Sequence, residues 1–393
     1  MGVSRMPHRT PKRNAQPRVS VAPNKSVRGA VDARPRGAKV VVDDAPWFTS
    51  KARTRLWHML VEVPRKFMEG VHLIRALLRV TDTNQGDPNA RFRLVWKYLP
   101  RTAQLSTLGL KFGRIIYRRS RMHQPREACT YTRFLRLGPQ LDVARQIALH
   151  FPPSASIRLT VLGCSTGAEL YSFVWTLRSA RPDLTVRPVG VDISSSAIDT
   201  ARHAVYPSRA PELQGISEHE LDSLFIRCGE SVQVRPWVSQ GVSWIIADAC
   251  DPKLVEILGP HDIVVANNFL IHMFPPHDET TLRNIVKLLQ PGGYLFAHGI
   301  DIDVRTRVAR ELGLVPVPLR IEQQHNEMDP EKLNQWPWHW CGREPLDRRV
   351  RDWELRYSTI FQLPRPGSNS KCPSLPKGRG LVSRRSRRAP PDW

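Results

Sequence analysis

The 393-residue chain lacks several features that would place it in a membrane or a secreted compartment. No apolar run approaches the roughly 18 residues that a membrane-spanning helix needs. Near the N-terminus there is no apolar h-region of a secretory signal peptide. The six cysteines are dispersed, and no two have the C-x-x-C spacing of a zinc or redox site. These absences predict a cytoplasmic protein with reduced thiols and no metal centre.

Acidic residues are scarce at both ends of the chain. Residues 1–41 hold ten Lys or Arg and one acid, and residues 365–393 hold eight and one. Of the formal charge of +23, only +7 falls on the 323 residues between them. Both ends are rich in Pro, Ser, Gly and Arg and have few large apolar residues, so we predict disordered tails over 1–45 and 365–393. They are solubilising tails or weak sites for an anionic partner such as nucleic acid or anionic lipid.

β-branched runs are nearly absent between residues 46 and 125. Apolar residues recur there at steps of three and four, with Arg and Lys between them. This periodicity predicts a small helical N-terminal domain over 46–125. The clearest segments are "LWHMLVEV", "KFMEGVHLIRALLRV" and "FRLVWKYL".

From about residue 157 short apolar runs alternate with helical patterns. This alternation predicts an α/β domain over 126–364, with a mostly parallel, Rossmann-like sheet covered by helices on both faces. Two late runs, "LVPVPLRI" and "LRYSTIFQL", are expected as antiparallel edge strands. The stretch "QWPWHWCG" between them has no clear period, and we expect a loop or cap that packs on the sheet and is not part of a site. The strand-like runs are "IRLTVLG", "VRPVGVD", "VSWIIAD", "HDIVVANN" and "GGYLFAHG".

No phosphate-binding motif follows the first expected strand. The turn "VLGCSTGAELYS" contains Gly163, Ser165, Gly167 and Glu169, but it is neither G-x-G-x-x-G nor a P-loop with its lysine. A nicotinamide-dependent dehydrogenase is therefore disfavoured. Glycines let a ligand approach the backbone, and the helix that follows offers free N–H groups. An acid such as Glu169 suits a ligand with a cationic amine.

The later strands also end in polar residues, where an open α/β sheet binds its ligands. Asp192 ends the second strand and is placed to bind ribose hydroxyls, although it also suits a helix cap. Asp248, followed by Ala249, is placed for an adenine amino group, and Asn267 and Asn268 end the fourth strand. An amine, a ribose and an adenine without phosphate describe S-adenosylmethionine.

These motifs resemble those of the CheR family, the chemotaxis receptor methyltransferases, which use S-adenosylmethionine to esterify receptor glutamates. "GCSTGAELYS" is similar to the family's G-C-S-T-G-E-E-P-Y-S, and "TYTRFLR" to its T-x-F-F-R segment. The resemblance spans residues 125–300 and implies a class I methyltransferase fold. It carries cofactor-binding roles to Thr132 and Arg136, and more weakly to Thr130. It likewise implies that Glu169 holds the methionine amine.

The sequence departs from that family where the acceptor would lie. Ala168 replaces the first acid of the acidic pair, Asn267 replaces an arginine, and His272 stands where the family has a tyrosine. The segment between Phe225 and Trp244, where the family carries a small β-subdomain for receptor contact, looks short. We therefore expect His272 to position the acceptor or act as a base, with a structural histidine as the alternative.

The main hypothesis is a CheR-type methyltransferase that transfers methyl from S-adenosylmethionine to a carboxylate or another oxygen or nitrogen acceptor. A protein carboxylate, a small metabolite and a glycan all remain open as acceptors. The alternative is a catalytically silent methyltransferase fold that works as a binding module through its basic tails.

Overall fold

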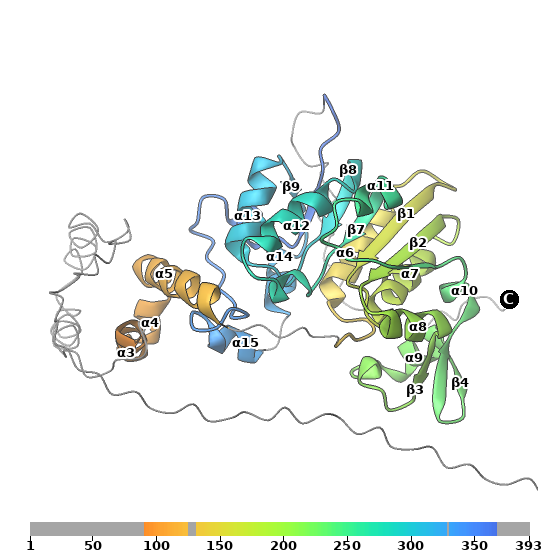
Figure 1. Cartoon of the computed structure of the whole chain (residues 1–393), viewed down its shortest axis with the longest axis horizontal. Coiled ribbons are helices and arrows are strands. Elements are labelled where there is room, and N and C mark those ends of the chain that lie inside the picture. Colours follow the sequence, from red (N-terminus) through yellow and green to blue (C-terminus); the bar gives the residue numbers. More distant parts are fainter. Residues whose placement is uncertain (1–89, 125–130, 328–329, 368–393) are drawn as a thin grey trace, which may run out of the picture. The chain divides into compact units, whose positions relative to one another are not determined.

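The computed structural model describes residues 90–124, 131–327 and 330–367, and all of them belong to one compact unit (Figure 1). Thr130, residues 1–89 and nearly all of the predicted C-terminal tail lie outside the described residues. The disorder predicted for the tails and most of the predicted helical domain therefore stay predictions. No helix in the described ranges combines the length and apolarity that crossing a membrane requires.

The main sheet has seven strands in the order β6-β2-β1-β7-β8-β10-β9. The pairs β6–β2, β2–β1, β1–β7 and β7–β8 are parallel. The predicted Rossmann-like, mostly parallel sheet is thus confirmed. Its strands are β1 Ser156–Leu162, β2 Thr185–Asp192, β6 Ser243–Ile246, β7 His261–Val265, β8 Leu289–Phe296, β9 Val315–Pro316 and β10 Ile360–Gln362.

Helices cover both faces of this sheet because successive side chains of a strand point to opposite faces. Ile263 and Val265 of β7 enter one apolar core, and Val264 between them enters the other. The first core is shared with α6 Gly138–Ala148 and α7 Ala168–Ala180. The second is shared with α11 Leu254–Leu258, α12 His277–Val286 and α13 Ile302–Glu311. This two-sided burial explains why the sequence shows continuous apolar runs.

The last two strands differ in part from their prediction. β10 pairs antiparallel with both β8 and β9, so its direction is as predicted. It is not an edge strand, however, because β9 lies outside it. Burial explains this position, since Ile360 and Phe361 are fully buried.

A second, three-stranded antiparallel sheet is present, and two of its strands fall in the segment between Phe225 and Trp244. Its order is β3-β5-β4, formed by Val205–Pro207, Ser231–Val234 and Phe225–Cys228. Val232 and Val234 alternate with exposed residues, and Gly229 makes the turn at φ +62°. The strands are only three or four residues long, which hid the period-two pattern.

Short helices complete the α/β domain. α8 Ser195–His203 follows β2, and its N-cap is Ser194. The remaining ones are η2 Pro211–Leu213, α9 Glu218–Leu224, α10 Pro236–Ser239, η3 Leu270–His272, α14 Ile321–Asn326, α15 Pro330–Gln335 and α16 Trp353–Tyr357.

The described part of the predicted N-terminal region is helical, with α3 Ala90–Tyr98, α4 Arg101–Gln104 and α5 Thr107–His123. These helices form their own small core, in which Trp96 meets Trp336 edge to face at 5.4 Å. A Cβ on Gly113 of α5 would lie 2.2 Å from the Trp336 ring. The Trp-rich stretch therefore packs on α3 and α5, and its predicted role as a cap on the sheet was wrong.

Candidate functional site

The turn after β1 approaches its neighbours so closely that it requires glycine at two positions. Gly163 and Gly167 have φ values of +63° and +87°. A Cβ on Gly163 would lie 2.9 Å from the Phe269 ring, and one on Gly167 would lie 2.8 Å from the Trp244 ring. The positive φ values and these close contacts both require glycine, and the turn leads directly into the N-terminus of α7.

Asp192 ties the ends of β1 and β2 together. Its Oδ2 accepts a hydrogen bond from the Ser165 N–H at 2.7 Å, and its Oδ1 accepts one from the Ser194 N–H at 2.9 Å. The half-buried carboxylate is thereby held in one orientation beside the glycine turn. The end of β6 lies next to it, because the Ala247 N–H donates to the Asp192 carbonyl at 3.0 Å. Asp248 is exposed there, and its Oδ1 accepts from the Cys250 N–H at 2.8 Å, with Ala249 between them.

Glu169 is almost fully buried and sits in a charged network. Arg136 Nη2 contacts its Oε2 at 2.5 Å, and Asn267 Nδ2 donates to its Oε1 at 2.7 Å. The Asn267 side chain is otherwise used inside the protein, since it also donates to Gln140 and accepts from the His298 N–H. The structure thus brings together the "TYTRFLR" segment, the start of α7 and the end of β7. The sequence had predicted these as separate parts of one site.

Two polar atoms in this site are buried without a hydrogen-bond partner. They are the Thr132 hydroxyl, whose residue is 2% exposed, and Arg136 Nε. Buried polar groups normally have partners, so these atoms indicate that a ligand completes the site. The carboxylates of Glu169 and Asp192 suit an amine and a ribose. The residues therefore fit S-adenosylmethionine, although the role of each one stays a prediction.

A cavity of about 650 Å³ opens beside this site, with Arg136, Asn268 and His272 on its wall. Asn268 has φ +61°, and its Oδ1 lies 3.1 Å from His298 Nδ1. The His272 ring meets Trp340 edge to face at 5.3 Å. His272 was predicted near the acceptor, and it does line a cavity next to the cofactor-binding residues.

The far wall of the cavity contains residues that the sequence analysis missed. Trp336, Trp340 and Cys341 belong to the stretch that we expected to lie outside any site, and all three line the cavity. Arg305 and Arg343 line it as well and are 5% and 8% exposed. One signal was present in the sequence: Arg305 shares a helix face with Ala309, a core position. Arg343 had none, because it follows an aperiodic segment.

Positive charge dominates the electrostatics of this wall. Burial, together with the charge of the other arginine, lowers the pKa of Arg305 to about 9, and burial lowers the pKa of Arg343 to about 10. Burial and the same arginines lower the pKa of His325 to about 3 and that of His298 well below its ordinary value. Desolvation raises the pKa of Glu327, also on the wall, to about 7.

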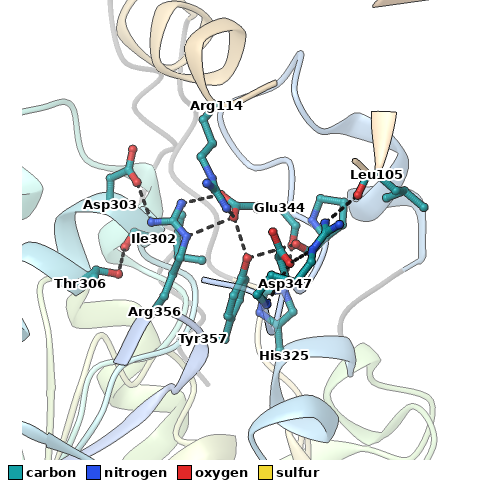
Figure 2. A network of polar contacts seen from close by, with 12 residues as sticks. Leu105, Arg114, Ile302, Asp303, Thr306, His325, Glu344, Asp347, Arg356 and Tyr357 are labelled. Carbon is teal, nitrogen blue, oxygen red and sulfur yellow. Dashed lines mark hydrogen bonds and ion pairs between the residues drawn. The ribbon is translucent and has the colours of Figure 1, made fainter. Parts of the chain in front are cut away.

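A different group of arginines binds Glu344, the residue that follows Arg343 in the chain. Arg114 of α5 donates to Glu344 Oε1 at 2.6 and 3.0 Å, and Arg356 donates to both oxygens of this carboxylate (Figure 2). The Tyr357 hydroxyl adds a bond to Oε1 at 2.7 Å. Arg356 also contacts Asp303 at 3.0 Å. This network fixes α5 and α16 against the segment that carries the cavity wall.

Sequence comparisons agree with this geometry. The family model "CheR methyltransferase, SAM binding domain" matches residues 130–300. "Probable biofilm formation methyltransferase WspC" of Pseudomonas putida is 33% identical over 163 residues, or 40% of this chain and 37% of the relative. "Chemotaxis protein methyltransferase" of Salmonella typhimurium is 29% identical over 213 residues, or 49% of this chain and 71% of the relative. The chain thus spans less than half the length of the WspC protein.

Structural comparisons return further methyltransferases at low overall similarity. An O-methyltransferase family protein from Burkholderia thailandensis has a TM-score of 0.30 and 14% identity, with 77% of this chain and 70% of that one covered. The amino pentose methyltransferase CalS10 of Micromonospora echinaspora has a TM-score of 0.25 and 18% identity, with 40% and 47% covered.

Proposed function

Because residues 130–300 match the model of the CheR S-adenosylmethionine-binding domain, we propose that the protein methylates an oxygen or nitrogen acceptor that enters the cavity beside Asn268 and His272. One observation carries this proposal. Glu169 contacts Arg136 and Asn267, and the cavity is lined by Arg136 and by Asn268, the residue after Asn267. A cofactor and an acceptor would therefore be adjacent.

S-adenosylmethionine, when bound, supplies a methyl group that its sulfonium has already activated. Glu169 would hold the amine of the cofactor, and the buried Thr132 hydroxyl and Arg136 would bind its amino-acid end. Asp192 would accept hydrogen bonds from the ribose, in the orientation that Ser165 and Ser194 impose. Asp248 and Ala249 would border the adenine, and Asn267 would hold Glu169 in place.

His272 is proposed to act on the acceptor. A carboxylate needs no base, whereas a hydroxyl or an amine must lose a proton, which a histidine near neutral pKa can accept. The edge-to-face contact with Trp340 fixes the imidazole ring on the cavity wall. A positioned base in this place is consistent with any of the three acceptor classes.

The relatives named as chemotaxis methyltransferases support a protein carboxylate as one acceptor. The three-stranded sheet β3-β5-β4 is present here, where that family is expected to carry its receptor-contact subdomain. His272 and Asn267 depart from the family, however, so a receptor glutamate is not the sole candidate. The silent binding module acting through basic tails falls on residues outside the described ranges, and it stays the alternative.

Isothermal titration with S-adenosylhomocysteine tests the cofactor site. We expect saturable binding to the wild-type protein and a tenfold or greater loss in Asp192→Asn, because a hydrogen bond to a charged group contributes about 1.5–3 kcal/mol. Asp199→Asn is the matched control, since Asp199 is exposed on α8 and pairs only with Arg202. Absence of saturable heat in the wild-type protein would overturn the proposal.

Methyl transfer needs a separate measurement. Lysate incubated with the protein and labelled S-adenosylmethionine should yield labelled product, and His272→Ala should reduce the rate. Base-labile label in protein identifies a carboxylate ester, and label in small molecules identifies metabolite chemistry. A protein that binds cofactor but labels nothing above a no-enzyme control would support the silent binding module instead.

A further inference from the structure

The cavity beside the predicted cofactor residues is lined by two buried arginines, Arg305 and Arg343, which form no ion pair with any described residue. We propose that it binds a small carboxylate-bearing molecule, whose carboxylate is held by Arg305 and Arg343. That this molecule is the methyl acceptor rests on the proposed function, whereas its binding does not.

Arg305 is held in place by carbonyl groups instead of acids. Its Nη1 and Nη2 donate to the carbonyls of Ala297 and Arg356 at 3.2 and 3.1 Å, and its Nε is buried without a partner. The side chain is more than nine-tenths buried on the cavity wall. These carbonyl contacts orient the guanidinium and leave its charge uncompensated.

Arg343 lines the same cavity from the C-terminal segment, and its guanidinium is likewise not fully hydrogen-bonded. Its Nη2 donates to the Gln324 carbonyl at 3.0 Å, and its Nη1 is buried without a partner. Arg343 lies close enough to Arg305 for its charge to contribute to the lowered pKa of Arg305. Both residues thus line the cavity, and each guanidinium keeps one buried N–H group without a hydrogen-bond partner.

The nearby carboxylates act on the two arginines without pairing with them, Asp301 on Arg305 and Glu327 on Arg343. Among the described residues neither arginine forms an ion pair, and the Glu344 carboxylate is used by Arg114 and Arg356. Glu327, with a pKa of about 7, is only partly ionised at neutral pH. His298 and His325 stay neutral because their pKa values are lowered. Since an isolated buried charge is strongly unfavourable, an anion from outside would complete the site.

Size and chemistry favour a small organic carboxylate over phosphate or a folded protein segment. A volume of about 650 Å³ lies within the range of small-molecule sites. Planar guanidinium groups bind carboxylates through paired hydrogen bonds, and Trp336 and Trp340 offer aromatic surface to an apolar body. No lysine lines the cavity among the residues that the structure describes.

Thermal unfolding of the full chain tests this site with phenylacetate, which has one carboxylate and one aromatic ring. Phenylacetamide is the neutral control, and inorganic phosphate tests the other anion. We expect a saturable rise in Tm with phenylacetate alone, and an apparent affinity at least fivefold weaker in Arg305→Gln and Arg343→Gln. Arg343→Lys, which keeps a charge, should retain part of the effect. Arg348→Gln, at an exposed ion pair with Glu322, should behave like the wild type.

Each other outcome overturns the inference. Equal shifts in wild type and both glutamine variants would place the anion elsewhere. A shift with phosphate but not phenylacetate would make the site a phosphate site, and no shift with either would leave the arginines purely structural. S-adenosylhomocysteine binding is measured on the same samples. Retained cofactor binding with a lost carboxylate effect refutes only this inference, and the reverse refutes only the methyltransferase.

Discussion

Arg343 and Glu344 are neighbours in the chain, yet Glu344 belongs to a network of ion pairs and Arg343 does not. The Glu344 carboxylate is buried and receives Arg114, Arg356 and the Tyr357 hydroxyl (Figure 2). Arg343 is buried as well, and within the described ranges its side chain donates to the Gln324 carbonyl and forms no ion pair. The charge of Glu344 is thus paired, whereas that of Arg343 has no ion-pair partner in the part of the chain that the structure describes. The difference separates a group that stabilises the fold from one that is prepared for a ligand.

Breaking the ion-pair network around Glu344 should have the largest effect on the free energy of unfolding. Glu344→Gln leaves Arg114 without a counter-charge and Arg356 with Asp303 alone, and should lower the free energy of unfolding by about 3–5 kcal/mol. Urea unfolding followed by circular dichroism measures this. Glu322→Gln, at an exposed pair with Arg348, is the control and should change little. A loss in Glu344→Gln no greater than in the control would contradict the role given to the network.

Acid should lower the stability of the fold through His325, which lies near Arg343 and Arg305. The folded pKa of His325 is about 3, below its unfolded value of about 6.5, so the unfolded chain binds more protons between these values. Stability is therefore complete above pH 6.5 and is lost as the pH falls toward 3, by roughly 3 kcal/mol at pH 4.5.

The control for the acid effect is His325→Gln, which does not titrate. Urea unfolding at pH 7 and pH 4.5 should show a smaller difference in this variant than in the wild type. The two proteins should also differ least at pH 4.5. Identical pH profiles would mean that His325 is not the group responsible.

Removing the charge of Arg343 should have a smaller effect on the free energy of unfolding, and of opposite sign. Arg343→Met, without added ligand, should raise the free energy of unfolding by about 1 kcal/mol, because a buried cation without a counter-ion is replaced by an apolar side chain. Arg114→Met at the paired group should instead be destabilising. Parallel urea curves of the two variants measure this difference, and a destabilised Arg343→Met would show that the charge supports the fold.

The smallest expected change concerns the unpartnered hydroxyl in the cofactor site. Thr132→Val keeps the shape and removes only the buried Oγ1, so the stability of the free protein should be unchanged. The affinity for S-adenosylhomocysteine should fall about threefold, which corresponds to the loss of one neutral hydrogen bond. Titration calorimetry and thermal unfolding of the same sample check both parts. Unchanged affinity would remove Thr132 from the site.

The sequence by itself determined the parallel sheet, and it predicted residues for the cofactor side of the candidate site. The strands β1, β2, β6, β7 and β8 and the helices after them follow from local periodicity, since each run is long and buried on both faces. Glu169, Asp192 and Asn268 were found because ligands bind where parallel strands end, a rule that needs only the order of elements.

Only the tertiary structure decided the acceptor side. The sheet β3-β5-β4 has strands too short for a clear pattern, and the Trp-rich stretch has no period at all. Arg305 and Arg343 lie 38 residues apart, and their shared lack of a counter-charge depends on what α5, α13 and the C-terminal segment place around them. Local residue patterns specify elements, whereas the balance of buried charge is set by contacts between segments distant in the chain.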